Sequence, residues 1–525
     1  MIEVKKQTEP VKKRLPDFPE ETVKKASGDI NKAFHQKVFT LFASGESEVH
    51  TLAKRFPHHY DYCMVLFEKD QGPYFLSGKG AERIRLWIGE ALHAGGDEIR
   101  ELYRLWLLDF ALFKSECAAL DAADLGRLSD AELYDAFFRF YRTYTMAGAL
   151  GYVADALISQ GESDWLGDFV RGELSAFGMT ENEITVGLPV LIQPQYQSFA
   201  LEAEWGLVRL GADIEALFGE IPALPRIEKE APALWQALVD YAKRFHWIEN
   251  NYFTVEVRDA GFFYKELQYK SAELEGTGKT FRELAEAYDR ERGESRERQQ
   301  ALIARLELGA KQNSLLESVW LFAEWKDRRK QTVLMGMHYF DRFFAAVAAR
   351  TGYEKSDMGF LVFPEIRPLL LEKKDMRRLI EARKMRTFYA ITPDGYFTAE
   401  GHDADRFFRH FSHEGDESVS ELRGVPACKG TVEGTVRIVR TKADMEAFRA
   451  GEILVTNQTT PEFVPIMKRA GAIVAEQGGI TSHAAVISRE LGVPCVIGIK
   501  TATRILQTGD KVQVDATNGI VKKIS

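Results

Sequence analysis

The chain lacks the features that mark secreted or membrane-bound proteins. It has only four cysteines, Cys63, Cys117, Cys428 and Cys495, and they are widely spaced. This spacing indicates neither a disulfide framework nor a zinc site, so we expect no protein-bound metal. No apolar run approaches the ~18 residues of a membrane span, and residues 1–6 lack the start of a signal peptide. The sequence therefore predicts a cytoplasmic protein with no membrane partner.

Basic runs are also missing. The chain has 69 Lys and Arg residues against 78 Asp and Glu residues, which gives a formal net charge of −9. No stripe of interleaved basic and aromatic residues occurs, and this argues against nucleic acid as a partner. The length of 525 residues, with 45% hydrophobic and 28% charged content, predicts a globular, multidomain protein.

The most specific pattern lies near the C-terminus, in the run Gly478-Gly479-Ile480-Thr481-Ser482-His483. An apolar-periodic segment follows and closes at Gly492 and Pro494, which predicts a short helix with His483 at its N-terminus. Free backbone N–H groups and the helix dipole make such a position favourable for phosphate. His483 is therefore predicted to carry a phosphoryl group.

Three linked pieces of sequence extend this pattern into a family resemblance: residues 424–434, residues 459–465 and the Gly-Gly-Ile-Thr-Ser-His run. Together they resemble the swivelling phosphohistidine domain of the PEP-utilising enzymes, a family that includes phosphoenolpyruvate synthase and rifampin phosphotransferase. The resemblance covers residues 423–525, about a fifth of the chain. It implies that His483 is the phosphorylated residue and that Thr481 assists it. Ser482, Gly478 and Gly479, beside them, are expected to support the phosphate. Ser482 could equally cap the helix, and the glycines suit a backbone role in either case.

The same region is expected to be a compact α/β domain. Runs rich in β-branched residues, bounded by glycine, proline or polar turns, predict strands. Between them lie short helical segments, and an Asn-Gly turn predicts a closing hairpin. The strands are expected at 435–439, 453–456, 472–475 and 495–499, the helices at 441–448 and 462–470, and the hairpin at 511–524.

The rest of the chain is predicted to be a large, mostly helical body at residues 27–401. Apolar and aromatic residues at helical spacing predict helices at 99–113, 130–144 and 315–325. Asp109 interrupts the first of these stripes and is expected at a solvated edge or in a paired core position. The exception to the helices is a strand-turn-strand pattern at 386–401.

Two further segments flank the body. Residues 1–26 are rich in lysine, glutamate and proline, which suits a mobile arm or a surface-bound strap. Residues 402–422 are polar and are expected to link the body to the C-terminal domain. The fold class is thus a multidomain α + α/β protein with a C-terminal swivelling domain.

The body also resembles, more faintly, the substrate-binding helical domain of the rifampin-phosphotransferase-like branch, at residues 191–199, 245–252 and 363–366. This resemblance implies an acceptor site that includes Gln193, Gln195, Trp247 and Asn251. Ordinary turns and helix starts, with Trp247 in the core, are the alternative.

An ATP-grasp pattern and a PEP-binding barrel were not found in the sequence. The run Ser77-Gly78-Lys79-Gly80 is too short for a phosphate loop. The resemblance then implies a separate ATP-grasp partner, which would bind ATP and Mg²⁺, and no covalently bound cofactor on this chain. We expect His483 to receive its phosphoryl group from that partner and to pass it to a small hydroxyl acceptor held by the body.

Two alternatives remain open from the sequence. One keeps phosphotransfer but links it to PEP or pyruvate. The other makes the chain a non-catalytic phosphocarrier or regulatory protein whose helical body binds another protein.

Overall fold

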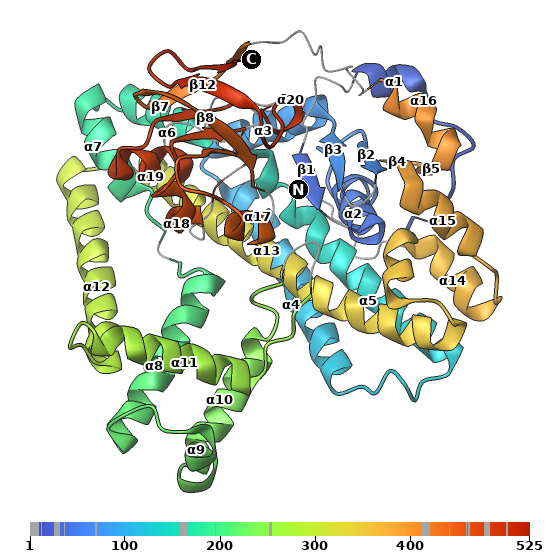
Figure 1. Cartoon of the computed structure of the whole chain (residues 1–525), viewed down its shortest axis with the longest axis horizontal. Helices are drawn as coiled ribbons and strands as arrows, with labels where there is room; N and C mark the ends of the chain where they lie inside the picture. The colour runs from blue at the N-terminus through green and yellow to red at the C-terminus, as the bar shows by residue number, and fades with distance from the viewer. Residues whose placement is uncertain are drawn as a thin grey trace. The chain divides into compact units, whose positions relative to one another are not determined.

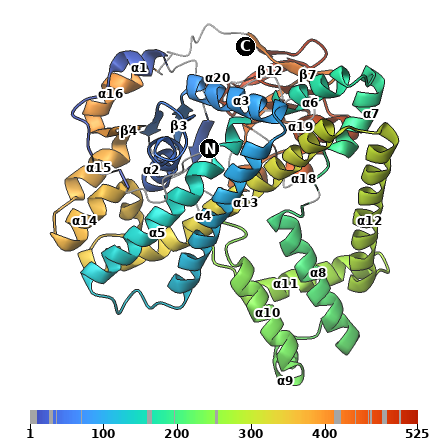
Figure 2. The same cartoon turned by 180° about the vertical axis from the view of Figure 1, so that it is seen from behind.

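The computed structural model divides the chain into two compact units, Met1–Phe408 and Arg409–Ser525 (Figures 1 and 2). A large, mostly helical unit is followed by an α/β unit, as the sequence predicts. None of the helices in the described ranges is long and apolar enough to cross a membrane. The structure describes residues 10–11, 13–25, 32–35, 37–68, 71–157, 165–194, 196–250, 255–410, 421–439, 442–457, 459, 463–476, 483–499 and 502–524.

Five antiparallel strands form a sheet in the N-terminal unit, in the order β1-β3-β2-β4-β5. Strands β4 and β5 are the hairpin expected at 386–401, but this hairpin is not an isolated exception among helices, because β2 pairs with β4 and places Met64 opposite Ala390. The bounds are β1 (Lys32–His35), β2 (Cys63–Glu68), β3 (Gln71–Leu76), β4 (Arg386–Thr392) and β5 (Gly395–Glu400).

Helices make up the rest of this unit. The predicted helices at 99–113, 130–144 and 315–325 are confirmed within α4, α5 and α13. The bounds are α1 (Glu20–Lys25), α2 (Val38–Gly45), the π-helix η2 (Glu46–Thr51), α3 (Gly78–His93), α4 (Asp97–Asp121), α5 (Asp130–Gly151), η3 (Ala154–Leu157), α6 (Trp165–Ala176), α7 (Glu181–Leu191), α8 (Phe199–Phe218), α9 (Leu224–Glu230), α10 (Pro232–Phe245), α11 (Ala260–Glu275), α12 (Phe281–Leu306), α13 (Ala310–Thr351), η4 (Lys355–Phe360), α14 (Phe363–Leu371), α15 (Arg377–Met385), η5 (Gly401–Ala404) and α16 (Asp405–Phe408).

Aromatic side chains fill the core between α4, α5 and α13, which lie side by side in both views (Figures 1 and 2). Phe137 of α5 stacks on Phe343 of α13 with ring centroids 4.4 Å apart. Trp106 of α4 lies 5.8 Å from Trp325 of α13, and both rings are fully buried. The apolar stripes read from the sequence therefore form core contacts, which are the main source of helix stability in a protein.

Asp109 takes the second of its two expected roles. Its carboxylate lies 2.6 Å from the guanidinium of Arg55, and both side chains are buried. Burial raises the pKa of Asp109, while the charge of Arg55 and its hydrogen bond to the carboxylate oppose that rise. Asp109 is thus a paired core carboxylate.

The described part of the N-terminal segment packs as a strap. The amide of Leu15 donates to the carbonyl of Tyr396 at 2.6 Å, and the amide of Tyr396 donates to the carbonyl of Lys13 at 3.0 Å. Phe18 is buried beside Phe388 of β4, with ring centroids 5.9 Å apart. Of the two alternatives for residues 1–26, residues 10–25 fit the surface-bound strap.

The segment expected to be a linker is partly ordered structure. Residues 402–408 belong to η5 and α16, which pack on β4 in the N-terminal unit, and Phe407 is fully buried against Phe388. Two adjacent phenylalanines, Phe407 and Phe408, in an otherwise polar stretch were the only sign of this packing in the sequence. Residues 411–420 lie outside the described residues.

The C-terminal unit is built on an eight-stranded mixed sheet, in the order β6-β13-β12-β8-β9-β10-β11-β7. Strands β8 to β11 are parallel, and the other pairs are antiparallel. The bounds are β6 (Glu421–Arg423), β7 (Val425–Cys428), β8 (Thr431–Ile438), β9 (Ile453–Thr456), β10 (Ala472–Ala475), β11 (Cys495–Ile497), β12 (Lys511–Asp515) and β13 (Ile520–Lys523), with helices α17 (Lys442–Glu446), α18 (Val464–Met467), α19 (His483–Leu491) and α20 (Ala502–Ile505).

Most elements of this unit match the sequence prediction. The strands predicted at 453–456 and 472–475 have the observed bounds of β9 and β10, and the predicted hairpin is β12 with β13. Alternate residues of β9 and β10 enter two separate hydrophobic clusters, so the sheet is buried on both faces. This explains why the strands read as continuous apolar runs.

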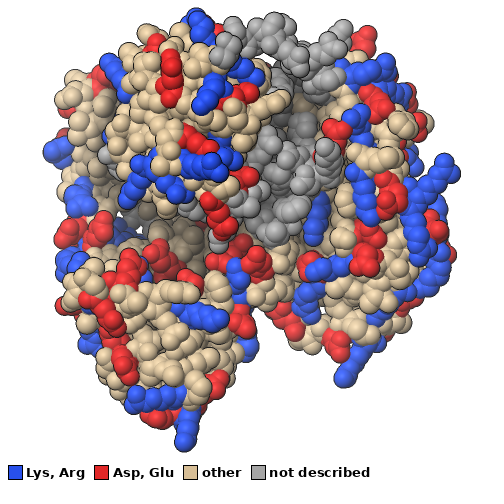
Figure 3. Space-filling model, viewed as in Figure 1, with Lys and Arg blue, Asp and Glu red and all other residues tan. Residues whose placement is uncertain are grey.

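Charged side chains of both signs are interspersed over the face of the protein that Figure 3 shows. This mixture agrees with the modest net charge of −9 on 525 residues.

Candidate functional site

Helix α19 begins at His483, the histidine that the sequence singles out. The preceding strand, β10, ends at Ala475. The backbone of His483 thus occupies the first position of a nine-residue helix, where N–H groups have no partner within the helix. Gly478, Gly479, Thr481 and Ser482 lie outside the described residues, so their assigned roles stay predictions.

The first turn of α19 is fixed on the sheet by small buried residues. Ala484 and Ala485 are 2% and 0% exposed and pack in one cluster with Ile473 of β10 and Cys495 of β11. The helix ends at Gly492, which has a positive φ of 67°, and the amide of Val493 donates to the carbonyl of Ser488 at 3.0 Å. A helix held at both ends gives His483 a defined backbone position.

Glu476 is a positioning residue that the sequence analysis missed. It stands directly after β10, and its Oε1 accepts hydrogen bonds from the amide and the hydroxyl of Thr503, at 2.7 and 2.8 Å. The amide of Glu476 donates to the carbonyl of Thr456 at 3.0 Å. These bonds tie the start of the segment that leads to His483 to α20 and to β9. The sequence did offer one sign of this role, because Glu476 is a single carboxylate between an apolar run and the pair Gly478-Gly479.

The sequence-predicted acceptor residues divide into two groups. Gln195 and Asn251 lie outside the described residues, and Gln193 and Trp247 lie within them. The Oε1 of Gln193 accepts a hydrogen bond from the hydroxyl of Ser295 on α12 at 2.6 Å. Trp247 is 2% exposed and lies in the hydrophobic core, 5.6 Å from the ring of Phe199. The two predicted segments therefore meet, but through core packing at Trp247.

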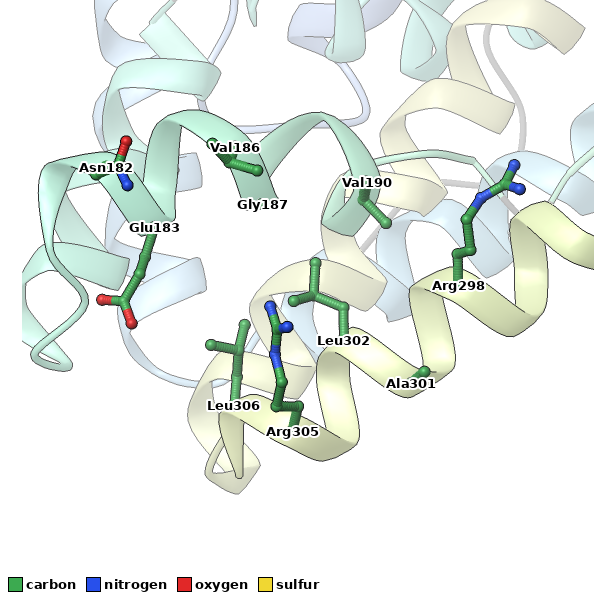
Figure 4. A pocket seen from close by; sticks show the side chains of 10 residues that line it. All are labelled: Asn182, Glu183, Val186, Gly187, Val190, Arg298, Ala301, Leu302, Arg305 and Leu306. Atoms are coloured by element: carbon green, nitrogen blue, oxygen red, sulfur yellow. The ribbon is translucent and has the colours of Figure 1, made fainter.

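A groove of about 540 Å³ lies between α7 and α12 of the N-terminal unit (Figure 4). Val190 and Arg298 mark one of its ends, and Gln193 follows just beyond the C-terminus of α7 at that end. Trp247 does not line it. The lining residues are Asn182, Glu183, Val186, Gly187, Val190, Arg298, Ala301, Leu302, Arg305 and Leu306.

Comparison with known proteins places the C-terminal unit in a family. Residues 448–519, which include His483, match the mobile domain of PEP-utilising enzymes. A probable phosphoenolpyruvate synthase of Archaeoglobus fulgidus is 47% identical over 115 residues, which are 21% of this chain and 15% of that protein. The phosphoenolpyruvate synthase of Pyrococcus furiosus is 47% identical over 112 residues, 21% of this chain and 14% of that protein.

A third relative matches a longer stretch. The rifampicin phosphotransferase of Streptomyces sviceus is 30% identical over 218 residues, 40% of this chain and 24% of that protein. This stretch is longer than the whole C-terminal unit, so it includes residues of the helical body. The chain spans a quarter or less of the length of these three relatives. The C-terminal unit is therefore similar to the mobile domain of the PEP-utilising enzymes.

Proposed function

We propose that the chain is a phosphotransferase component in which His483 accepts a phosphoryl group and passes it to a small hydroxyl compound held by the helical body. The proposal rests on two observations about His483. His483 opens α19, and it lies within the stretch that matches the mobile domain of PEP-utilising enzymes. The relative that matches beyond the C-terminal unit is named a phosphotransferase.

The first step charges the histidine. A neutral imidazole nitrogen of His483 attacks a phosphorus atom of a bound nucleotide; the N–P bond forms as the bond from that phosphorus to the oxygen of the leaving group breaks. Thr481 assists by hydrogen bonding, and the backbone around Gly478 and Gly479, with Ser482, supports the phosphoryl oxygens. A separate ATP-grasp protein holds ATP and Mg²⁺ in this proposal.

The second step delivers the phosphoryl group. The acceptor hydroxyl oxygen attacks phosphorus, the N–P bond breaks, the imidazole becomes neutral again, and the hydroxyl proton is released. Donor and acceptor are on different proteins or units, so the C-terminal unit must move between them. The pivot was expected within residues 412–425, before the first strand, but Glu421–Arg423 and Val425 belong to strands β6 and β7 of the sheet. The pivot proposed here is therefore confined to residues 412–420, which lie outside the described residues. Gln193, Gln195 and Asn251 stay the proposed acceptor residues. Trp247 is 2% exposed in the hydrophobic core, as in the alternative for this residue, so it is left out of the proposed site.

Radiolabel transfer from ATP tests the proposal. The chain is incubated with an ATP-grasp protein and with ATP labelled with ³²P at the β or, in a separate reaction, at the γ phosphorus. The label on the chain is measured after treatment with acid or alkali. We expect a label that is lost in acid and stable in alkali, as for a phosphorylated imidazole. His483→Ala should abolish it, and His402→Ala, a 96%-exposed histidine of the N-terminal unit, should keep it.

Three results would count against the proposal. Absence of label on the unaltered chain contradicts phosphoryl uptake. Label that persists in His483→Ala contradicts the assigned residue, and uptake from PEP alone contradicts the assigned donor.

A further inference from the structure

The groove between α7 and α12 combines an apolar floor with a cationic rim (Figure 4). Its floor consists of Val186 and Val190 from α7 and of three apolar residues from α12, Ala301, Leu302 and Leu306. Val186 is 70% exposed, so this apolar surface faces water. Surface of this kind in a concave site is typical of a place where a ligand displaces water.

Two arginines flank this floor from the same side of α12. Arg298 and Arg305 are seven residues apart and therefore about two helical turns apart on one face. Both belong to the groove lining, and in Figure 4 their guanidinium groups rise from α12 toward the side where α7 lies. The groove thus offers two cationic groups along one wall.

The positive charges of Arg298 and Arg305 are only weakly neutralised by nearby carboxylates. Arg305 forms no ion pair with a described residue. Glu183 also lines the groove, and its carboxylate accepts hydrogen bonds from the amide and hydroxyl of Thr180, at 2.8 and 2.7 Å, where it caps α7. These bonds lower the pKa of Glu183, and the charge of Arg305 lowers it to a smaller extent. Arg298 has one ion pair, 3.6 Å from Glu294, and both side chains are more than half exposed. Such a pair contributes little, so both guanidinium groups can bind an anion.

The walls of the groove are preformed. Gln299, which is 1% exposed, donates through Nε2 to the carbonyls of Val190 and Leu191 at 2.9 and 3.0 Å. Trp320 of α13 donates to the same carbonyl of Leu191 at 2.9 Å. These bonds fix the C-terminal end of α7 against α12, so a ligand would not have to assemble the site.

We propose that this groove binds a small organic anion with an apolar, ring-containing body and one acidic group, a carboxylate, sulfonate or phosphate. The volume of about 540 Å³ suits one such molecule, since small-molecule sites span ~300–1,000 Å³. The apolar body covers the floor, and the acidic group is bound by Arg298 and Arg305 through charge-assisted hydrogen bonds. This inference depends on the groove alone and not on phosphoryl transfer by His483.

A matched pair of fluorescent probes tests the inference. 8-Anilino-1-naphthalenesulfonate and N-phenyl-1-naphthylamine share a ring system, and only the first carries an acidic group. Both become brighter when they leave water. We expect one sulfonate probe to bind per chain, more tightly than the neutral probe. Arg298→Gln with Arg305→Gln should weaken sulfonate binding ~10-fold, the loss of one to two charge-assisted contacts at an exposed site, and leave the neutral probe unchanged.

Control variants separate the groove from the rest of α12. Arg282→Gln with Arg290→Gln removes the same charge from exposed positions of the same helix outside the groove, and should leave both affinities unchanged. Val186→Asp adds a carboxylate at an exposed position of the floor and should weaken both probes.

Three outcomes would overturn the inference. The first is equal affinity for the sulfonate probe in the groove variant (Arg298→Gln with Arg305→Gln) and in the control variant (Arg282→Gln with Arg290→Gln). The second is no binding of the sulfonate probe at millimolar concentration. The third is that light scattering shows a dimer, which Val186→Asp dissociates. The last result would assign the groove to a second copy of the chain.

Discussion

Glu46 is a buried carboxyl group whose replacement by glutamine should stabilise the N-terminal unit at alkaline pH. It opens the π-helix η2 and is fully buried. Its side chain accepts hydrogen bonds from the amide of Val11 at 2.9 Å and from the hydroxyl of Tyr141 at 2.8 Å. Burial raises the pKa of Glu46 from 4.5 to about 7, against the opposing effects of Tyr141, Val11 and the charge of Lys54.

The direction of the effect follows from this raised pKa. The folded state favours the protonated carboxyl group, so its contribution to stability is complete below pH 4.5 and is lost as the pH rises through about 7. The pKa rises by about 2.5, and a change of one in pKa corresponds to roughly 1.4 kcal/mol, which gives a loss of about 3.5 kcal/mol. Glutamine stays neutral at every pH, and its amide can both accept from Val11 and donate to the oxygen of Tyr141.

Tryptophan fluorescence is a suitable measure, because all eight tryptophans lie in the N-terminal unit. Urea unfolding at several values between pH 5 and pH 8.5 gives the free energy of unfolding of each protein. We expect Glu46→Gln and the unaltered chain to differ little near pH 5, and the variant to be more stable by up to about 3.5 kcal/mol at pH 8.5. Glu286→Gln, at an exposed position of α12, is the surface control.

A stability difference that does not change with pH would refute this reasoning. It would mean that Glu46 is ionised at both ends of the range or reaches water. A variant that is less stable than the unaltered chain at pH 8.5 would also contradict it.

Three further substitutions test the packing of the two units. Asp109→Ala should lower the free energy of unfolding of the N-terminal unit by about 3–5 kcal/mol, because it leaves Arg55 buried and unpaired; the joint change Arg55→Met and Asp109→Leu should cost less in urea unfolding. Gly519→Ala should destabilise the C-terminal unit by about 1–3 kcal/mol more than Gly451→Ala. Both glycines have a positive φ, but only at Gly519 would an added Cβ clash with a backbone oxygen, that of Gly424. Hydrogen exchange in β12 and β13 measures the difference. Gln299→Leu should cost about 1–3 kcal/mol in urea unfolding, because the carbonyls of Val190 and Leu191 each lose one of their donors.

The C-terminal unit could be predicted closely because its signals are local. Strands β9 and β10 are short runs of β-branched and small apolar residues, each followed by polar residues or glycine, and the helix that follows the second strand opens at His483. Burial on both faces makes such runs continuous and easy to recognise. Glu476 was missed because its partner, Thr503, is distant in the sequence.

The N-terminal unit was harder to predict because its contacts are long-range. Strand β2 pairs with β4 across more than 300 residues, and no local pattern reports that pairing. The charged run of η2, Glu46–Thr51, reads as solvent-exposed although it is buried throughout. Trp247 illustrates the same limit, because a tryptophan in a core and one in a cleft have the same spacing in the sequence.

Localisation of the phosphoryl group by tandem mass spectrometry tests the central claim most directly. Trypsin cleaves after Lys and Arg, so it releases residues 470–489 as one peptide, in which His483 is the only histidine and Thr481, Ser482 and Ser488 are the only hydroxyl residues. After incubation with ATP and the ATP-grasp protein, the account predicts one phosphoryl group on His483 in this peptide, removed by brief acid treatment. His483→Ala should stay unmodified, and its free energy of unfolding should change by no more than about 0.5 kcal/mol, as for a surface substitution. An acid-stable phosphate on one of the hydroxyl residues, or a phosphate in another peptide, would contradict the account.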